Sequence, residues 1–238
     1  MGKRKKTADY ADKKKRLSTE EMIKRYLKVY AGAIYDVLEH RGLPNQVLSL
    51  EIKPLMPHMK VAGPAFTVCS TRAARGTIKR RGSSSDMIGD MTPGCVIVYS
   101  TGREQKSGHW GEMTSASSYA HGAQGVVVDG GARDATHLIA RDFPCFCRYS
   151  SPIEAGSRQR VVDYDIPILI SGSLTETILV RPGDWVYGDY DGVIIIPQEI
   201  AEEVLHETEK EVAIENKARE ELLAGGEPGK IIKKYGKF

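Results

Sequence analysis

A helix, a buried strand and a glycine turn follow one another in the stretch Gly111–Asp134, GEMTSASSYAHGAQGVVVDGGARD. Small apolar residues recur in its first half at spacings of three and four: Met113, Ala116, Ala120 and Ala123. This spacing predicts a helix from about Glu112 to Ala123 with a small apolar face. Val126–Val128 is β-branched throughout and too short for a helix, so it predicts a buried strand. Open α/β sheets bind ligands at the carboxyl ends of their strands, and Arg133 and Asp134 are predicted to lie there.

The Arg-Asp pair has a chemistry that narrows the class of ligand. Arg133 presents a planar fork of donors that matches a carboxylate or an α-keto acid. Asp134 presents a hard oxygen ligand for Mg²⁺ or Mn²⁺. Gly130 and Gly131, directly before the pair, allow a ligand to approach the backbone. Taken alone, the two residues also fit an ordinary ion pair on a surface loop.

The segment resembles the signature of the RraA-like family, which includes the 4-hydroxy-4-methyl-2-oxoglutarate (HMG) aldolases. That signature is Gly-Asp or Gly-Glu, then about twenty residues, then Arg-Asp; here the first pair is Gly111-Glu112. Three further pieces are similar to family strands in the same order: Val61–Val68, Arg181–Asp184, and Gly188–Val193 with Pro197. The resemblance covers roughly Ile23 to Gly225, which is most of the chain.

One position departs from the family pattern. The family's aldolases place Asp or Glu three residues after the metal-binding aspartate, where this chain has His137. On a helix, Asp134 and His137 share a face. An imidazole there can bind the metal or orient its water, with a preference for Mn²⁺ or Zn²⁺ over Mg²⁺. The alternative is that His137 only caps or packs.

The resemblance implies a lyase that depends on a divalent metal, Mg²⁺ or Mn²⁺. Such an enzyme cleaves a C–C bond of a 4-hydroxy-2-oxo acid, gives pyruvate through an enolate, and can also decarboxylate oxaloacetate. Asp134 would bind the metal, with His137 as a weaker candidate ligand. Arg133 and Asp134 would act in catalysis, and Arg133 would also bind the keto-acid end of the substrate. Glu112 would organise metal-bound water.

The same resemblance places substrate contacts at the start of the predicted helix. Gly111 and Glu112 would lie against the substrate, and the backbone N–H groups of Met113 and Thr114 would hold its carboxylate, because helix N-termini bind anions. An acidic residue from a neighbouring subunit would complete the site, and Glu199 is the candidate for it. The expected ligand is therefore a small anionic keto or hydroxy acid.

Two other functions stay open. Some members of the family are named as regulators of ribonuclease activity and act through protein–protein contacts, without catalysis. The basic tail and the loss of the acidic residue at His137 favour this regulator role. Alternatively, the same metal site could serve a lyase for another hydroxy or sugar acid, with a pocket lined by Trp110 and Arg72. A basic cluster, Arg72–Arg81, could steer anionic acids or form a solvated face or subunit contact.

The pattern of elements predicts an α/β fold. A capping box at Ser18 starts an N-terminal helix, a βα-patterned part follows, and short strands separated by Pro and Gly come after it. We expect a swivelling β/β/α sandwich of the RraA-like type in one compact domain, 18–225. N-terminal helices precede it, a long helix over Glu199–Ala224 ends it, and tails cover 1–17 and 226–238.

Composition limits the partners. Residues 1–16 carry a net charge of +6, so the rest of the 238-residue chain is at −3 and has no basic stripe of the kind that nucleic-acid binders use. Nucleic acid is therefore an unlikely partner. We expect neither a membrane span nor a signal peptide, and four cysteines suggest buried thiols of a cytoplasmic protein. The long acidic helix suggests a homo-oligomer, a trimer or hexamer in view of the resemblance.

Overall fold

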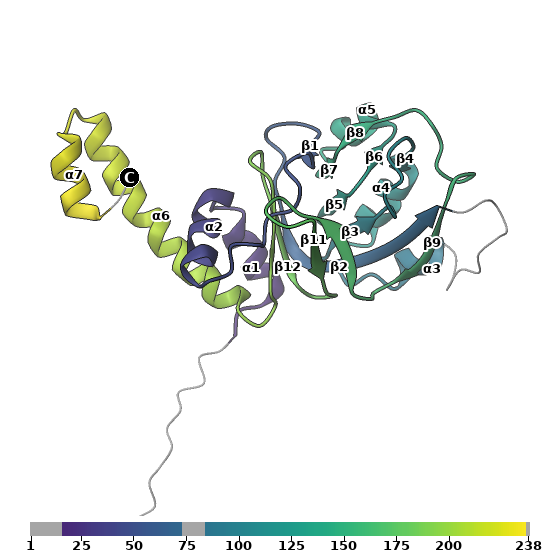
Figure 1. Cartoon of the computed structure of the whole chain (residues 1–238), viewed down its shortest axis with the longest axis horizontal. Coiled ribbons are helices and arrows are strands. Elements are labelled where there is room, and N and C mark those ends of the chain that lie inside the picture. Colours follow the sequence, from purple (N-terminus) through teal and green to yellow (C-terminus); the bar gives the residue numbers. More distant parts are fainter. Residues whose placement is uncertain (1–15, 73–83, 237–238) are drawn as a thin grey trace, which may run out of the picture.

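Eight strands form the central sheet of the computed structural model, which describes residues 16–72 and 84–236 (Figure 1). Their order is β1-β7-β5-β3-β2-β12-β13, and β9 also pairs with β2. The strands are β1 (Lys53–Pro54), β2 (Val61–Arg72), β3 (Val96–Ser100), β5 (Gly125–Val128), β7 (Cys145–Cys147), β9 (Gln159–Tyr164), β12 (Trp185–Gly188) and β13 (Val193–Ile196). β2, β3, β5 and β7 run parallel, and the outer pairings are antiparallel.

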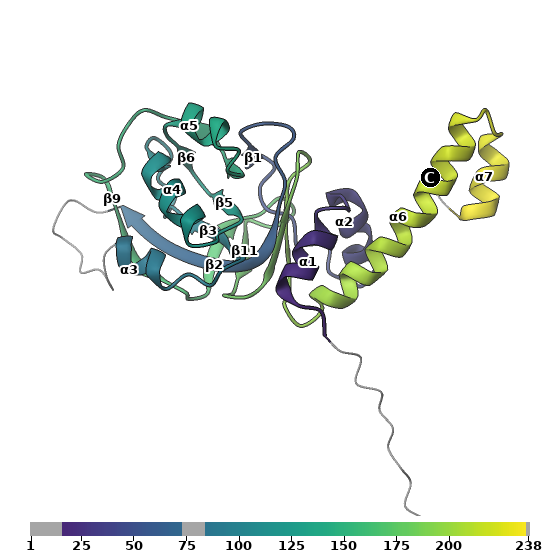
Figure 2. The same cartoon turned by 180° about the vertical axis from the view of Figure 1, so that it is seen from behind.

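The long strand β2 curls the sheet. On one edge its start pairs with β12, over Val61–Pro64, and its end pairs with β9 after a register shift at Cys69. On the other edge its middle pairs with β3. A bulge in a strand increases its bend and twist, so β2 carries the chain from one end of the body to the other (Figures 1 and 2).

A second, three-stranded sheet continues the first. β4 (Gly108–Trp110), β6 (Gly131–Ala132) and β8 (Tyr149–Ser150) pair in the order β4-β6-β8, all parallel. Each follows one central parallel strand along the chain: β4 follows β3, β6 follows β5, and β8 follows β7. The small sheet therefore extends three neighbouring strands beyond their carboxyl ends.

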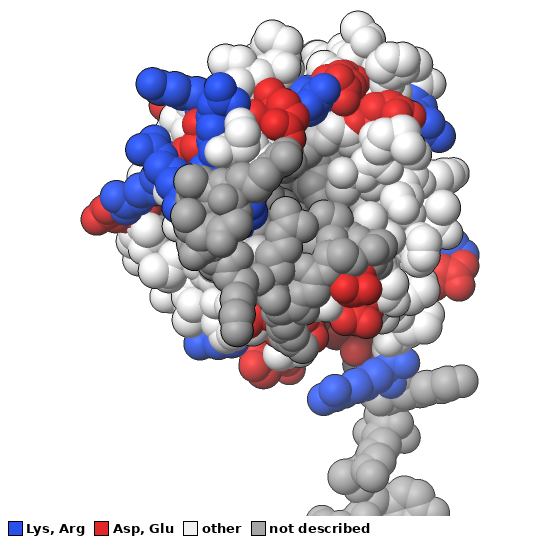
Figure 3. Space-filling model, turned by 90° about the vertical axis from the view of Figure 1, so that its right-hand side faces the viewer, with Lys and Arg blue, Asp and Glu red and all other residues white. Residues whose placement is uncertain are grey.

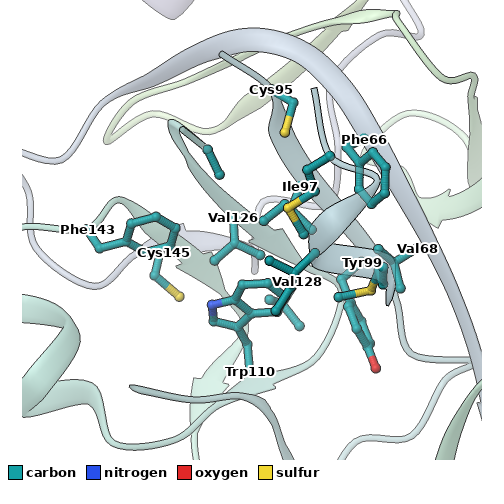
Figure 4. Close-up of a cluster of buried hydrophobic side chains, with 14 of the residues drawn as sticks. Phe66, Val68, Cys95, Ile97, Tyr99, Trp110, Val126, Val128, Phe143 and Cys145 are labelled. Carbon is teal, nitrogen blue, oxygen red and sulfur yellow. The ribbon is translucent and has the colours of Figure 1, made fainter. Parts of the chain in front are cut away.

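Alternate side chains of the parallel strands enter two separate cores. Val126 and Val128 pack in a cluster with Trp110 and Phe143, on the side covered by the helices α3 (Ser84–Gly89), α4 (Glu112–Ala120) and α5 (Ala135–Ala140) (Figure 4). Val127 packs on the opposite side, against the hairpin of β10 (Ile168–Ser171) and β11 (Thr177–Val180). The unbroken valine run is thus a strand buried on both faces.

The remaining helices lie beyond β12 and β13 and form what we call the helical arm: α1 (Thr19–Tyr26), α2 (Ala31–His40), α6 (Ala201–Leu223) and α7 (Pro228–Tyr235). Tyr26, Leu38 and Val204 are buried together with Trp185 in this region. The first part of α6 packs on α1 and α2, and the rest extends away from the body to α7, which folds back on it (Figures 1 and 2). The apolar residues of α6 near its start are therefore covered by the chain itself.

Most predicted elements are found within one to three residues of their expected bounds. The capping box is confirmed in part, because Ser18 Oγ accepts a hydrogen bond of 3.2 Å from the backbone N–H of Glu21. The predicted apolar face of α4 is wrong. Met113 is 78% exposed, and the buried residues of α4 are Ser115 and Ser118. Ser115 can be buried because its hydroxyl is hydrogen-bonded to the Trp110 indole and to the carbonyl of Gly111.

Most of the expected basic tail, 1–17, and most of the basic cluster, Arg72–Arg81, lie outside the described residues. The expected C-terminal tail, 226–238, contains α7. No described helix has the length and apolar character that a membrane span requires. Cys95, Cys145 and Cys147 are buried free thiols, as predicted, and Cys69 is half-buried. Figure 3 shows acidic and basic side chains next to one another at the end of the body near β2 and β9.

Candidate functional site

A cavity of about 340 Å³ opens at the carboxyl ends of the small sheet. Its walls come from the ends of β4 and β6, from the first turn of α4, and from a loop that follows β8. The lining residues are Gly108, His109, Gly111, Glu112, Met113, Thr114, Arg133, Asp134, Glu154, Ala155 and Gly156. The Arg-Asp pair therefore lies in a cavity at a strand end, as the sequence predicts.

Arg133 and Asp134 are fixed by the backbone around them. The N–H of Arg133 donates to the carbonyl of Trp110 at 2.8 Å, which continues the pairing of β6 with β4. Asp134 has φ 56° and ψ 34°, a left-handed conformation that only a few non-glycine residues adopt. Its Oδ2 lies 3.3 Å from the Nε of Arg133. Both side chains stay about one-third exposed, so each can also contact a ligand.

Gly111 and Glu112 hold the Asp134 carboxylate from the side of α4. The backbone N–H of Glu112 donates to Asp134 Oδ2 at 3.3 Å. A Cβ at Gly111 would lie 2.9 Å from that same oxygen, so this position requires glycine. Gly111 is also the N-cap of α4 and has no side chain to cap it. The N–H groups of Met113 and Thr114 have no acceptor within the helix, and both residues line the cavity.

The Glu112 side chain has a partner that sequence reasoning missed. Its Oε1 lies 3.2 Å from Arg141 Nη2, at the end of α5. The contact ties α4, whose first turn lines the cavity, to the end of α5, whose N-cap residue Asp134 lines it as well. Glu112 and Arg141 are 29 residues apart, so no helical spacing in the sequence signals this pairing.

A buried pair of side chains supports the glycine turn behind the cavity. His109 Nε2 lies 2.8 Å from Glu104 Oε2, and the two side chains are 0% and 5% exposed. The Nδ1 of His109 accepts a hydrogen bond of 3.1 Å from the backbone N–H of Gly131. Because Nδ1 accepts this hydrogen bond, the neutral ring carries its proton on Nε2, the nitrogen that faces Glu104, and the ring holds the turn that leads to Arg133.

Burial and hydrogen bonding set the charges of this pair. Burial lowers the pKa of His109 below its ordinary value, and this effect outweighs the attraction of the Glu104 carboxylate. Burial alone would raise the pKa of Glu104, but the backbone N–H groups of Ser107 and Lys106 and the His109 ring hold it below its ordinary value. A neutral imidazole thus lies beside an ionised carboxylate. Sequence reasoning missed both residues.

Several predicted residues lie elsewhere. His137 is exposed on α5 and does not line the cavity, so its role as a metal ligand stays a prediction. Glu199 is exposed just before α6, in the helical part of the molecule away from α4 and α5 (Figure 1), so its role also stays a prediction. The prediction of a pocket lined by Trp110 and Arg72 is wrong. Trp110 is 1% exposed in the core (Figure 4), and Arg72 contacts the carbonyl of Arg103.

The carboxylates of the cavity limit the kind of metal site that could form there. Among the described residues, no three His, Cys, Asp or Glu side chains gather to form a metal cage, so a four-ligand zinc site does not fit. Asp134 offers a single carboxylate, held by Gly111 and Glu112, at the edge of an open cavity. Mg²⁺ is bound in proteins in this way, through one or two carboxylates with several retained waters. Asp134 would hold such an ion.

Comparison with known proteins gives relatives that span this region. A protein of Halalkalibacterium halodurans, named "Putative 4-hydroxy-4-methyl-2-oxoglutarate aldolase", is 30% identical over 204 residues, which are 86% of this chain and 89% of that protein. DlpA of Legionella pneumophila is 26% identical over 188 residues. Those residues are 79% of this chain but only 29% of DlpA.

Two solved structures share the fold. One, described as among novel cellulases from microbes associated with the gut ecosystem, is 34% identical with a TM-score of 0.76, over 87% of this chain and 90% of its own. The other is RraAS2 of Streptomyces coelicolor, an unusual member of the RNase ES inhibitor RraA protein family. It is 24% identical with a TM-score of 0.73, over 84% of this chain and 96% of its own.

The expected mixed α/β fold, with its curled sheet and long C-terminal helix, is confirmed by these structures. The family model described as RraA-like, Aldolase/RraA, matches residues 31–195, a range that contains the whole cavity lining. The chain belongs to the RraA-like family.

Proposed function

We propose that the protein is a lyase that depends on a divalent metal and cleaves the C–C bond of a 4-hydroxy-2-oxo acid to release pyruvate. The observation that carries the proposal is the cavity itself, in which Arg133, Asp134 and the uncapped first turn of α4 converge. The name of the relative from Halalkalibacterium halodurans supports the same reaction class. Decarboxylation of oxaloacetate is part of the proposal, because it leaves the same pyruvate enolate.

The residues of the cavity can perform the steps that this chemistry needs. The substrate carboxylate binds the N–H groups of Met113 and Thr114, which helix N-termini supply for anions. Arg133 directs its guanidinium at the keto group and stabilises the negative charge that develops on the pyruvate fragment. Glu112, held by Arg141, orients water in the cavity. A bound Mg²⁺ or Mn²⁺ at Asp134 would supply Lewis-acid polarisation of the keto acid.

The test is turnover with and without metal. The wild-type protein should release pyruvate from oxaloacetate and from 4-hydroxy-4-methyl-2-oxoglutarate with Mg²⁺ or Mn²⁺, and a chelator should stop both reactions. Asp134→Ala should lose about 10³-fold in kcat, since metal catalysis contributes several kcal/mol of transition-state stabilisation. The variant should keep the melting temperature of the wild type, because the Asp134 side chain is 36% exposed.

Two outcomes would contradict the proposal. Full activity of Asp134→Ala at limiting metal would show that Asp134 does not bind the metal. The absence of pyruvate release by the wild type from both substrates would remove the lyase function, and binding to a ribonuclease would then be the function to test.

We also propose that the chain forms a homo-oligomer, a trimer or a hexamer. Ile214, Leu223 and Ile232 on the outer part of the helical arm are 36%, 83% and 39% exposed. A second subunit that covers them would remove this apolar surface from water. A solution mass of one 26.2 kDa chain would contradict the proposal.

A further inference from the structure

Glu154 is an acidic residue of the cavity wall that the proposed chemistry has not used. It lines the cavity from the loop after β8, opposite the strand ends that carry the Arg-Asp pair. A Cβ at Gly156 would collide with its Oε1, so the carboxylate lies over Gly156, another lining residue. Because Gly156 has no side chain, the Glu154 carboxylate has room to lie over it.

One strand, β4, separates the Glu154 segment from β6 and the Arg-Asp pair that follows it. Glu154 forms a parallel bridge with Gly108 of β4, and the N–H of Gly108 donates to the carbonyl of Ile153 at 2.8 Å. On its other side, β4 pairs with β6. A Cβ at Gly108 would lie 2.6 Å from the Cβ of Arg133, so the strand carries no side chain between Arg133 and the Glu154 segment. Glu154 and Arg133 therefore border the same cavity, and the residue of β4 between their two segments is Gly108.

Glu154 differs from the other titratable groups in the cavity because they are already engaged. Asp134 is bonded to Arg133 and to the N–H of Glu112, and Glu112 is paired with Arg141. His109 accepts the N–H of Gly131 at Nδ1, and its Nε2 lies 2.8 Å from Glu104 Oε2. Within residues 16–72 and 84–236, no donor or cation pairs with the Glu154 carboxylate; its backbone carbonyl alone is bonded, to Arg158.

We propose that Glu154 is the general base that removes the hydroxyl proton of the substrate in aldol cleavage. This inference rests on the proposed function. The carboxylate takes the proton from the C4 hydroxyl, the C3–C4 bond breaks, and C4 becomes a carbonyl. The electron pair of the broken bond moves into the pyruvate fragment as its enolate. The proton on Glu154 then returns to C3 and completes the methyl group of pyruvate, so no further reactant is needed.

The two reactions of the site differ in their need for this base. Cleavage of a 4-hydroxy-2-oxo acid cannot proceed without loss of the hydroxyl proton. In oxaloacetate C4 is itself a carboxylate carbon and carries no hydroxyl, so the C3–C4 bond breaks with release of CO₂ and no O–H proton is removed. The ratio of the aldol-cleavage rate to the decarboxylation rate therefore measures the contribution of the base. The rate of oxaloacetate decarboxylation measures whether the other residues of the site still function.

The experiment compares Glu154→Gln with the wild type on 4-hydroxy-4-methyl-2-oxoglutarate and on oxaloacetate, at saturating Mg²⁺. The ratio of kcat for aldol cleavage to kcat for decarboxylation should fall by about 10²-fold or more, the usual size of a general-base effect. Glu154→Asp keeps a carboxylate and should recover part of the ratio. Glu220→Gln removes an exposed carboxylate of α6, far from the cavity, and should leave the ratio unchanged.

The outcomes separate the inference from the function on which it rests. If Glu154→Gln keeps the wild-type ratio, or lowers both rates equally, Glu154 is not the base, although the lyase function stands. A wild-type protein that decarboxylates oxaloacetate but cleaves no 4-hydroxy-2-oxo acid also overturns the inference. A wild-type protein that turns over neither substrate overturns the proposed function first, and the inference falls with it.

Discussion

The body beneath the cavity and the helical arm both contain an arginine paired with carboxylates, but in opposite surroundings. Beneath the cavity, Arg148 and Asp129 are 9% and 10% exposed, and their Nε and Oδ1 lie 2.6 Å apart. In the arm, Arg41 of the α2 end lies 2.7 Å from Glu207 of α6, and these side chains are 25% and 44% exposed. Water and salt reach the second pair and hardly reach the first.

The difference shows how each region keeps its shape. Asp129, at the end of β5, also accepts hydrogen bonds from the N–H and the hydroxyl of Ser171, so this network joins strand ends below the cavity. A buried charge that loses its partner is costly, and the network therefore fixes one arrangement. Exposed ion pairs contribute little and are screened by salt. The arm is held by its apolar contacts, and its ion pairs only add to them.

The first prediction tests this contrast with the same substitution in both places. Arg148→Gln should lower the free energy of unfolding by about 3 kcal/mol, because it leaves the Asp129 carboxylate buried without its cation. Arg41→Gln should lower it by less than about 1 kcal/mol, and this cost should shrink in high salt. Chemical denaturation at low and high salt measures both. Equal losses of unfolding free energy in the two variants would show that the buried and the exposed ion pair contribute equally.

The second prediction compares two glycines. A Cβ at Gly108 would lie 2.7 Å from the carbonyl oxygen of Ser151, so Gly108→Ala should cost about 1–3 kcal/mol of stability and also impair turnover through Arg133. Gly229 lies in α7, and a Cβ there would meet no other atom within 4 Å. Gly229→Ala should stabilise the protein by about 0.5–1 kcal/mol, since alanine favours helix. Thermal and chemical unfolding of the two variants measure both effects. A neutral Gly108→Ala would show that β4 can shift without cost.

The third prediction concerns acid and should have the smallest effect. The pKa of His109 in the folded protein lies below its ordinary value of 6.5, so the unfolded chain binds more protons and stability falls as the pH drops below about 6.5. Glu104, whose pKa lies below 4.5, adds a further loss at lower pH. His109→Gln should flatten the decline between about pH 6.5 and 5. Unfolding curves over that range measure it, and an unchanged slope would mean that His109 does not titrate on unfolding.

The sequence was a good guide where local pattern and burial agree. The valine run Val126–Val128, the turn to Arg133, and the glycine at 111 were predicted because strand periodicity and the family signature both point to them. Met113 was placed wrongly because apolar character was taken to decide the inner face of α4, whereas a hydrogen bond from Trp110 to Ser115 draws the serine inside. Trp110 was predicted to line a pocket, but its indole is buried in the core, where Ser115 accepts its N–H.

Contacts that depend on folding of distant segments could not be predicted. Glu154 reaches the cavity because its loop pairs with Gly108, 46 residues earlier in the chain. No local sequence pattern around Ile153 or Gly156 predicts that pairing. The Glu104–His109 pair is close in sequence, but its burial depends on the turn at Gly131 folding over the ring.

The small sheet also has a thermodynamic consequence. Because β4 and β6 extend the parallel strands β3 and β5, Arg133 and Glu112 follow backbone that is already hydrogen-bonded on the strand ladder. A site built on free loops must lose conformational entropy when the ligand binds, at roughly 1–2 kcal/mol for each residue that becomes ordered. Here that entropy is lost during folding of the chain. Binding energy from the substrate can therefore be used for the transition state, which is the condition for a high turnover rate.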